Sequence, residues 1–113
     1  MDDRAADIKK YVTELFVHED EPLIFAKLNS KKNTLPPIEV PSTVGKLLFL
    51  LAKLQKPKRI LEIGTLGAYS TLWLEKALEP GGKIITLEIV PEHIACAKET
   101  IKHANKEDRI EIR

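Results

Sequence analysis

Two carboxylates and a hydroxyl, those of Glu62, Glu88 and Ser70, flank a short glycine turn. Gly64 and Gly67 lie in that turn, and a glycine lets the backbone approach a ligand with no Cβ in the way. The turn leads into a helix start, where free N–H groups and the helix dipole favour a small anionic group. Glu88 lies 21 residues after Gly67. A nucleotide-binding βαβ unit has, at about this spacing, the carboxylate that binds the ribose of the nucleotide. The spacing therefore predicts a site for a ligand that carries a ribose and a charged group.

This turn is expected to lie between a strand and a helix. The apolar run at 60–63, interrupted by Glu62, predicts a buried parallel strand, and residues 69–78 predict an amphipathic helix. Further along, the pattern predicts strands at 83–88 and 109–113, with a helix at 91–104 between them. Alternating strands and helices predict an α/β fold with a parallel, doubly wound sheet and right-handed crossovers.

More helices are expected before this unit. Residues 3–17 carry apolar side chains at helical spacing, residues 23–32 predict a second short helix, and three prolines stiffen an extended loop at 34–41. Ser42 is expected to N-cap a third helix that runs to Gln55. One face of that helix carries a strong apolar stripe, formed by Val44, Leu47, Leu48, Leu51 and Leu54.

The stretch from Leu61 to Leu74, LEIGTLGAYSTLWL, resembles the first motif of S-adenosylmethionine-dependent O-methyltransferases. The resemblance is strongest to the metal-dependent branch, which includes catechol and caffeoyl-CoA O-methyltransferases and their small bacterial relatives. It continues through Pro80–Lys83, Leu87–Glu88 and Pro91–His93, and so spans about residues 35–113.

The resemblance implies a Rossmann-like class I methyltransferase sheet, truncated in this chain after about three parallel strands and preceded by N-terminal helices. In that family the first strand is central, with the second and then the third beside it. The family's N-terminal helices cover the active site and contribute to dimer contacts. We therefore expect residues 1–33 to be a lid or dimer contact and residues 34–113 to be the N-terminal part of the cofactor-binding domain.

The resemblance also implies a set of cofactor-binding residues: Val40, Glu62, Gly64, Thr65, Ser70 and Glu88. Burying the lone carboxylate of Glu62 is costly, so a cationic neighbour such as the ammonium or sulfonium of S-adenosylmethionine is expected there. Ser70 matches the serine that binds the methionine carboxylate, or it caps a helix. Val40 contacts the cofactor through its backbone, or belongs to a plain connector. Ile89 packs against adenine or in the core.

The implied reaction is transfer of a methyl group from S-adenosylmethionine to a hydroxyl of a small, catechol-like aromatic acceptor. A divalent cation (Mg²⁺) is expected for the full-length family, with ligands after the fourth strand that match no residue of this chain. No catalytic residue is assigned, and the 113-residue chain alone is expected to be inactive. The bare strand edge left by a truncated sheet favours self-association, such as a homodimer.

Two alternatives remain open. A NAD-dependent oxidoreductase fragment would place glycines as G-x-G-x-x-G, and Leu66 in place of the second glycine argues against it. The other alternative is a non-enzymatic fragment that only dimerises or binds a partner. Titration with NAD and with S-adenosylhomocysteine would distinguish these possibilities.

The composition is ordinary for a globular domain, with 43% hydrophobic residues, 31% charged residues and a net charge of +1. The charge balance does not favour a nucleic-acid partner, and no apolar run approaches the ~20 residues that a membrane span needs. The N-terminus lacks a hydrophobic signal core. The one cysteine, Cys96, excludes an internal disulfide and favours the cytoplasm, with the thiol buried as a small apolar group.

Several other polar or aromatic residues are expected to have structural roles. The segment from His18 to Pro22 carries potential metal ligands, but a solvated acidic linker is the preferred interpretation. Tyr69 and Trp73 are predicted to pack in the core, and His93 and His103 to lie on the surface of their helix.

Overall fold

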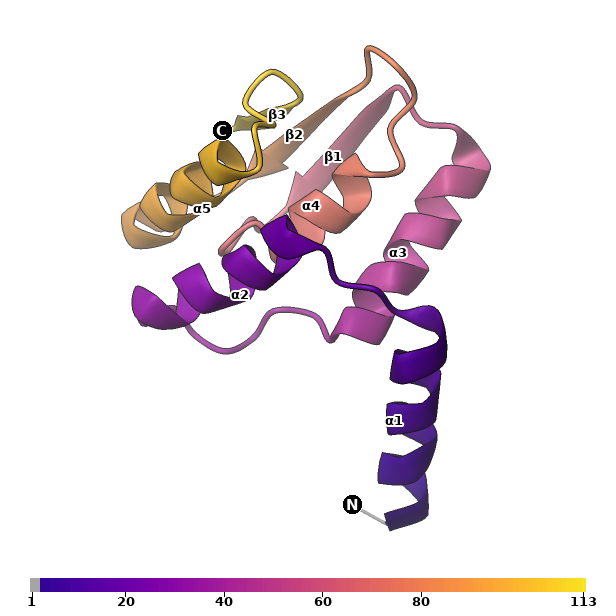
Figure 1. Cartoon of the computed structure of the whole chain (residues 1–113). Coiled ribbons are helices and arrows are strands. Elements are labelled where there is room, and N and C mark those ends of the chain that lie inside the picture. Colours follow the sequence, from indigo (N-terminus) through magenta and orange to yellow (C-terminus); the bar gives the residue numbers. More distant parts are fainter. Residues whose placement is uncertain (1–2) are drawn as a thin grey trace.

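Three parallel strands form the sheet of this molecule, in the order β1-β2-β3 (Figure 1). The computed structural model describes residues 3–113, in which β1 is Arg59–Ile63, β2 is Lys83–Leu87 and β3 is Ile110–Ile112. β1 pairs with β2 from Arg59 opposite Lys83 to Ile63 opposite Leu87, and β3 pairs with the other side of β2. The predicted parallel α/β sheet is confirmed, and within the described residues β1 is an edge strand.

The helices that connect the strands cover one face of the sheet (Figure 1). α4 is Tyr69–Glu75 and connects β1 to β2, and α5 is Pro91–His103 and connects β2 to β3. α4 ends three residues before the predicted limit, because Ala77 and Leu78 donate to carbonyls three residues back and tighten the chain into a turn. α5 begins at Pro91, as expected, without a side-chain cap.

The expectation that β1 is buried is wrong for one of its faces. Leu61 is 64% exposed and Ile63 is 83% exposed, because no helix in residues 3–113 covers the face of the sheet to which they belong. Side chains alternate between the two faces of a strand, so Glu62 lies on the face that α4 covers. Thr86, the register partner of Glu62 on β2, is fully buried on the same face.

Three helices precede the sheet: α1 (Asp3–Phe16), α2 (Glu21–Lys32) and α3 (Ser42–Gln55). α2 begins two residues earlier than predicted, because the Asp20 carboxylate accepts a hydrogen bond from the backbone N–H of Leu23 at 3.1 Å. The predicted Ser42 cap is wrong: Pro41 holds the N-cap position of α3, and no side chain caps that helix.

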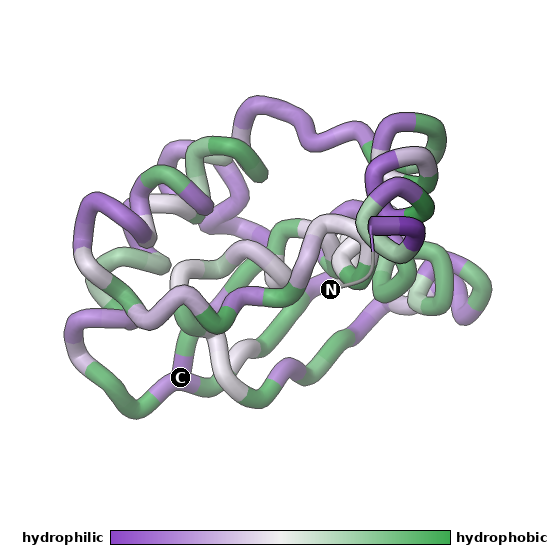
Figure 2. Tube along the Cα trace, turned by 90° about the horizontal axis from the view of Figure 1, so that it is seen from below, coloured by the Kyte–Doolittle hydropathy of each residue, from purple (hydrophilic) through white to green (hydrophobic). Residues whose placement is uncertain are grey.

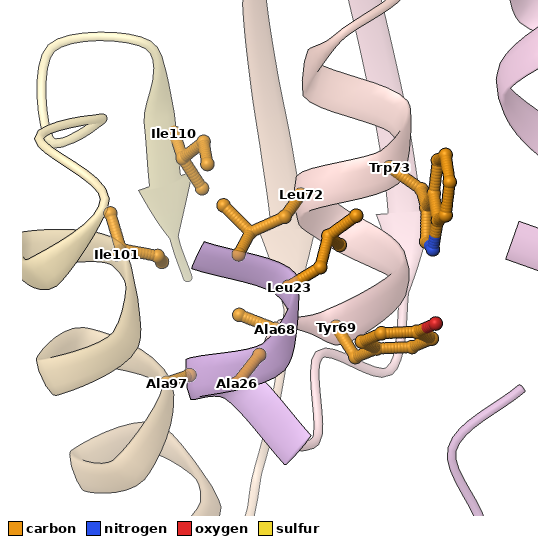
Figure 3. Packing of buried hydrophobic residues seen from close by; sticks show 9 residues of the cluster. All are labelled: Leu23, Ala26, Ala68, Tyr69, Leu72, Trp73, Ala97, Ile101 and Ile110. Atoms are coloured by element: carbon orange, nitrogen blue, oxygen red, sulfur yellow. The ribbon is translucent and has the colours of Figure 1, made fainter. Parts of the chain in front are cut away.

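A single hydrophobic cluster joins α2, α4, α5 and β3 (Figure 3). α2 contributes Leu23 and Ala26 and lies between α4 and α5, with which it is in contact. The remaining members belong to the start and body of α4, to α5 and to β3: Ala68, Tyr69, Leu72, Trp73, Ala97, Ile101 and Ile110. The core packing predicted for Tyr69 and Trp73 is confirmed, and α2 is thereby part of the core that supports the turn after β1.

α1 and the outer face of α3 leave many apolar side chains exposed. α1 projects from the rest of the molecule (Figure 1), and none of its residues is buried. Most of the predicted stripe on α3 is exposed, with Leu54 at 81%. Along the helices in Figure 2 the tube alternates between hydrophilic and hydrophobic residues, as expected for amphipathic helices. No helix in residues 3–113 combines the length and apolar character that a membrane span needs.

The contact between α3 and α4 predicts a large effect of one added methyl group. A Cβ at Gly45 would overlap the indole ring of Trp73, which is 2% exposed. We expect Gly45→Ala to lower the free energy of unfolding by about 1–3 kcal/mol through overpacking, as measured by urea denaturation. Lys53→Ala, at an exposed position of the same helix, is the control and should change it by less than about 0.5 kcal/mol. Equal stability of the two variants would contradict this packing.

Candidate functional site

A cavity of about 460 Å³ opens where β1 and β2 end. This volume is within the range of about 300–1,000 Å³ that is typical of small-molecule sites. All six residues predicted to bind a cofactor line it: Val40, Glu62, Gly64, Thr65, Ser70 and Glu88. The structure thus gathers them around one space, and their individual roles toward a ligand stay predictions.

The turn between β1 and α4 has an unusual backbone. Gly64, Leu66 and Ala68 all have positive φ angles, of 91°, 51° and 70°. Gly64 adopts this conformation without steric cost, and a Cβ at this position would meet no atom within 4 Å. For Gly67 the constraint differs from the one expected, because its Cβ would overlap the hydroxyl of Ser30 on α2. A side chain at position 67 would therefore force the Ser30 hydroxyl on α2 to move.

Glu62 collects three side-chain hydrogen bonds. Its Oε1 accepts from Thr71 at 2.5 Å and from Thr86 at 2.8 Å, and its Oε2 accepts from Ser70 at 2.7 Å. Thr65 lies 2.6 Å from the hydroxyl of Thr86, and since Thr86 gives its hydrogen to Glu62, Thr65 is the donor of that pair. These neutral hydroxyls fix the carboxylate in place without supplying a positive charge.

The helix-capping alternative for Ser70 is wrong. Ala68 holds the N-cap position of α4, and no side chain caps the helix. The Ser70 hydroxyl instead points to Glu62 at the wall of the cavity. Ser70 is therefore available to the site rather than to the helix end.

Glu88 is held by backbone donors from two segments. Its Oε2 accepts from the N–H of Leu66 at 2.9 Å, and its Oε1 accepts from Ile89 at 2.8 Å and Val90 at 3.2 Å. Burial raises the pKa of the Glu88 carboxyl, but these hydrogen bonds and the charge of His93 outweigh it and keep the pKa below its ordinary value of 4.5. Glu88 thus presents a fixed, ionised carboxylate to the cavity.

His93 is a polar cavity residue that sequence reasoning missed. We predicted a surface position, but the structure places its side chain, 17% exposed, on the cavity wall with Nδ1 3.6 Å from Oε2 of Glu88. The first turn of α5 begins at Pro91 and turns back over the end of β2, which brings residue 93 beside residue 88. The sequence signal that could have placed His93 at the site is its position in the first turn of the helix that follows Glu88.

The other structural predictions had mixed outcomes. His103 is exposed, as expected, and its Nε2 lies 2.7 Å from Oε1 of Glu21. Ile89 is 91% exposed, so its core-packing alternative is wrong. Cys96 is buried, and burial raises the pKa of its thiol.

The acidic segment before α2 is anchored rather than simply solvated. Glu19 accepts from the Tyr69 hydroxyl at 2.7 Å and from Lys27 at 2.9 Å, and Asp20 is paired with Lys76. These bonds attach the linker between α1 and α2 to α4. In residues 3–113, no three His, Cys, Asp or Glu side chains are grouped so that they could hold a metal ion.

Comparisons with known proteins agree on one family. A sequence model of the O-methyltransferase family matches residues 14–113. A catechol O-methyltransferase from Niastella koreensis is 40% identical over 106 residues, which are 94% of this chain and 48% of that protein. The chain spans about half the length of the curated relatives that it matches.

Solved structures support the same relationship. The crystal structure of an O-methyltransferase from Bacillus cereus in complex with S-adenosylhomocysteine (SAH) matches with a TM-score of 0.90 and 39% identity, over 95% of this chain and 49% of that one. The O-methyltransferase TomG from Streptomyces achromogenes, in complex with S-adenosylmethionine (SAM), matches with a TM-score of 0.86 and 38% identity, over 94% and 48%.

The lowered pKa of Glu88 predicts how its contribution to stability depends on pH. A carboxyl whose pKa is lower in the folded state stabilises the fold above its unfolded-state pKa, and this stabilisation is lost as the pH falls through the folded-state pKa. We therefore expect Glu88→Gln to lower the free energy of unfolding by about 1–2 kcal/mol at pH 7. The difference from the original chain should shrink steadily below about pH 4.5 in urea titrations.

Glu107→Gln, at an exposed position, is the matched control for removal of one charge. It should leave the unfolding free energy within about 0.5 kcal/mol at pH 7. A Glu88→Gln difference that stays constant or grows on acidification would show that the ionised carboxylate is not what stabilises the turn.

Proposed function

This chain belongs to the O-methyltransferase family, and from that premise we propose that its cavity binds SAM. The observation that carries the proposal is the pair of carboxylates, Glu62 and Glu88, held at the ends of adjacent strands on the wall of one cavity. SAM is a cation with a ribose, and two fixed carboxylates suit both features. Bound SAM supplies an activated methyl group on its sulfonium.

Glu88 is proposed to bind the ribose of the cofactor. A carboxylate oxygen can accept about two hydrogen bonds. Oε1 already accepts from Ile89 and Val90, whereas Oε2 accepts one backbone bond, from Leu66. Oε2 therefore keeps an acceptor position for a ligand hydroxyl, and a hydrogen bond to an ionised group is stronger than a neutral one.

Glu62 is proposed to face the cationic methionine end of SAM. Its three donors are neutral hydroxyls, so its negative charge is available to a ligand ammonium or sulfonium. Ser70 is proposed to bind the methionine carboxylate, for which its hydroxyl must turn away from Glu62. The Thr65 hydroxyl is committed to Thr86, so Thr65 and Gly64 would contribute backbone groups, as would Val40 across the cavity.

The proposed reaction moves the methyl group to a hydroxyl of a small, catechol-like aromatic acceptor, as the names of relatives suggest. The S–CH₃ bond breaks and an O–CH₃ bond forms, the sulfonium becomes a neutral thioether, and the acceptor loses its proton. Holding the donor in a fixed orientation is the contribution of the residues described above. For the full-length family a divalent cation such as Mg²⁺ would favour the ionised nucleophile, but residues 3–113 hold no group of His, Cys, Asp or Glu side chains that could bind it.

We propose that the 113-residue chain alone binds cofactor but does not turn over. Ligands of such sheets bind in the crevice where the strand order reverses. In the described residues β1 is paired on one side only, so one wall of that crevice is in place. We place the protein in the cytoplasm, for which a single buried cysteine, Cys96, is suitable.

Calorimetric titration tests the proposed site directly. We expect SAH to bind the chain in the presence of a metal chelator, and Glu88→Ala to weaken the affinity about 10- to 100-fold through loss of a charged hydrogen bond. Glu62→Gln should lower the affinity for SAM because it removes the charge that faces the sulfonium. Glu107→Gln, the exposed control, should change neither affinity. Binding of NAD but not SAH, or SAH affinity unchanged in Glu88→Ala, would overturn the proposal.

The bare face of β1 predicts self-association into a homodimer or larger assembly of this chain. Leu61 is 64% exposed on an edge strand, and exposed apolar edges favour pairing with another chain. We expect Leu61→Lys to shift the chain toward monomer in sedimentation velocity experiments. Leu54→Lys, at a still more exposed position on α3, should not shift it. The reverse pattern would place the contact on α3 instead of the sheet.

A further inference from the structure

His93 brings a polar ring to the wall of the cavity. Its Nδ1 lies 3.6 Å from Oε2 of Glu88, too far for a hydrogen bond between them. Within the described residues its ring takes part in no hydrogen bond. Its side chain is 17% exposed and lines the cavity. A ring nitrogen and a carboxylate oxygen therefore face the same space without satisfying each other.

We propose that His93 determines specificity for ribose, because its Nδ1 and Oε2 of Glu88 together bind the two neighbouring ribose hydroxyls of the cofactor. The inference rests on the proposed binding of SAM. It adds His93 to the proposed binding residues and predicts selectivity for a ligand with both ribose hydroxyls. His93 would distinguish a ribonucleoside ligand from a deoxyribonucleoside that has otherwise the same chemistry.

The hydrogen-bonding capacity of the site supports this assignment. Oε2 of Glu88 already accepts from the N–H of Leu66, so one acceptor position remains for one ligand hydroxyl. The N–H groups of Ile89 and Val90 are bound to Oε1, and the Thr65 hydroxyl is bound to Thr86. A second ribose hydroxyl therefore needs another partner beside Glu88, and an imidazole nitrogen that carries a hydrogen can donate to it.

An indirect role of His93 makes a different prediction. The charge of His93 helps to lower the pKa of Glu88, so His93 could act only by keeping that carboxylate ionised. Two other acids, Glu39 and Glu62, also line the cavity. Such an effect would act on every ligand that Glu88 binds, whether or not both hydroxyls are present. A direct contact depends on one particular hydroxyl.

Calorimetry with SAH and its 2′-deoxy and 3′-deoxy analogues separates the two roles. In the original chain we expect at least one deoxy analogue to bind about tenfold more weakly than SAH, the effect of one lost hydrogen bond. In His93→Ala, the affinity for SAH should fall by a similar factor. The affinity for the discriminated deoxy analogue should be the same in His93→Ala as in the original chain. His93→Asn, which keeps a polar atom near the position of Nδ1, should recover part of the SAH affinity.

The control is His103→Ala, on the same helix but exposed and paired with Glu21. It should leave all three affinities unchanged. If His93→Ala lowers the affinities for SAH and for both analogues equally, or lowers none of them, the inference is wrong while the proposed function stands. If the original chain fails to bind SAH at all, the proposed function fails and the inference with it.

Discussion

The arrangement of this molecule depends on keeping a carboxylate on the covered face of a sheet. An unpaired carboxylate buried beside apolar groups is costly unless donors surround it. Glu62 of β1 meets this requirement with hydroxyls from Ser70 and Thr71 of α4 and from Thr86 of β2. These bonds join the two strands and the helix that connects them. The tight turn between β1 and α4 is the geometry that brings the hydroxyls of α4 over the strand.

The carboxylate of Glu88, at the end of β2, is likewise surrounded by hydrogen-bond donors. Its backbone donors come from the turn after β1, through Leu66, and from the start of α5, through Ile89 and Val90. The two acids therefore fasten both connections that leave the carboxyl ends of β1 and β2. The charges that could bind a ligand are also the groups that order the loops around it. Ligand binding at this site would thus require little new ordering, which favours affinity.

The sequence could predict the strands, the helices and the position of the cavity, because each depends on a pattern of nearby residues. Apolar periodicity located the strands and helices to within a few residues, and the spacing from Gly67 to Glu88 located the cavity. The errors came from long-range contacts: Gly67 packs against Ser30 of α2, and His93 reaches the site because α5 begins beside the end of β2. The apolar pattern of β1 likewise could not show which of its faces a helix covers.

The alternation along β1 explains how a polar site and a bare apolar surface arise from one strand. Glu62 must face α4 because its hydroxyl donors are there, and the period of two then places Leu61 and Ile63 on the opposite face. A one-residue slip that buried the two apolar side chains would expose Glu62 and lose its hydrogen bonds. The hydrogen bonds of the carboxylate therefore help to fix the register, together with the partial burial of Ile60 on the same face. This permits the cavity wall to form on the covered face even while the other face stays open.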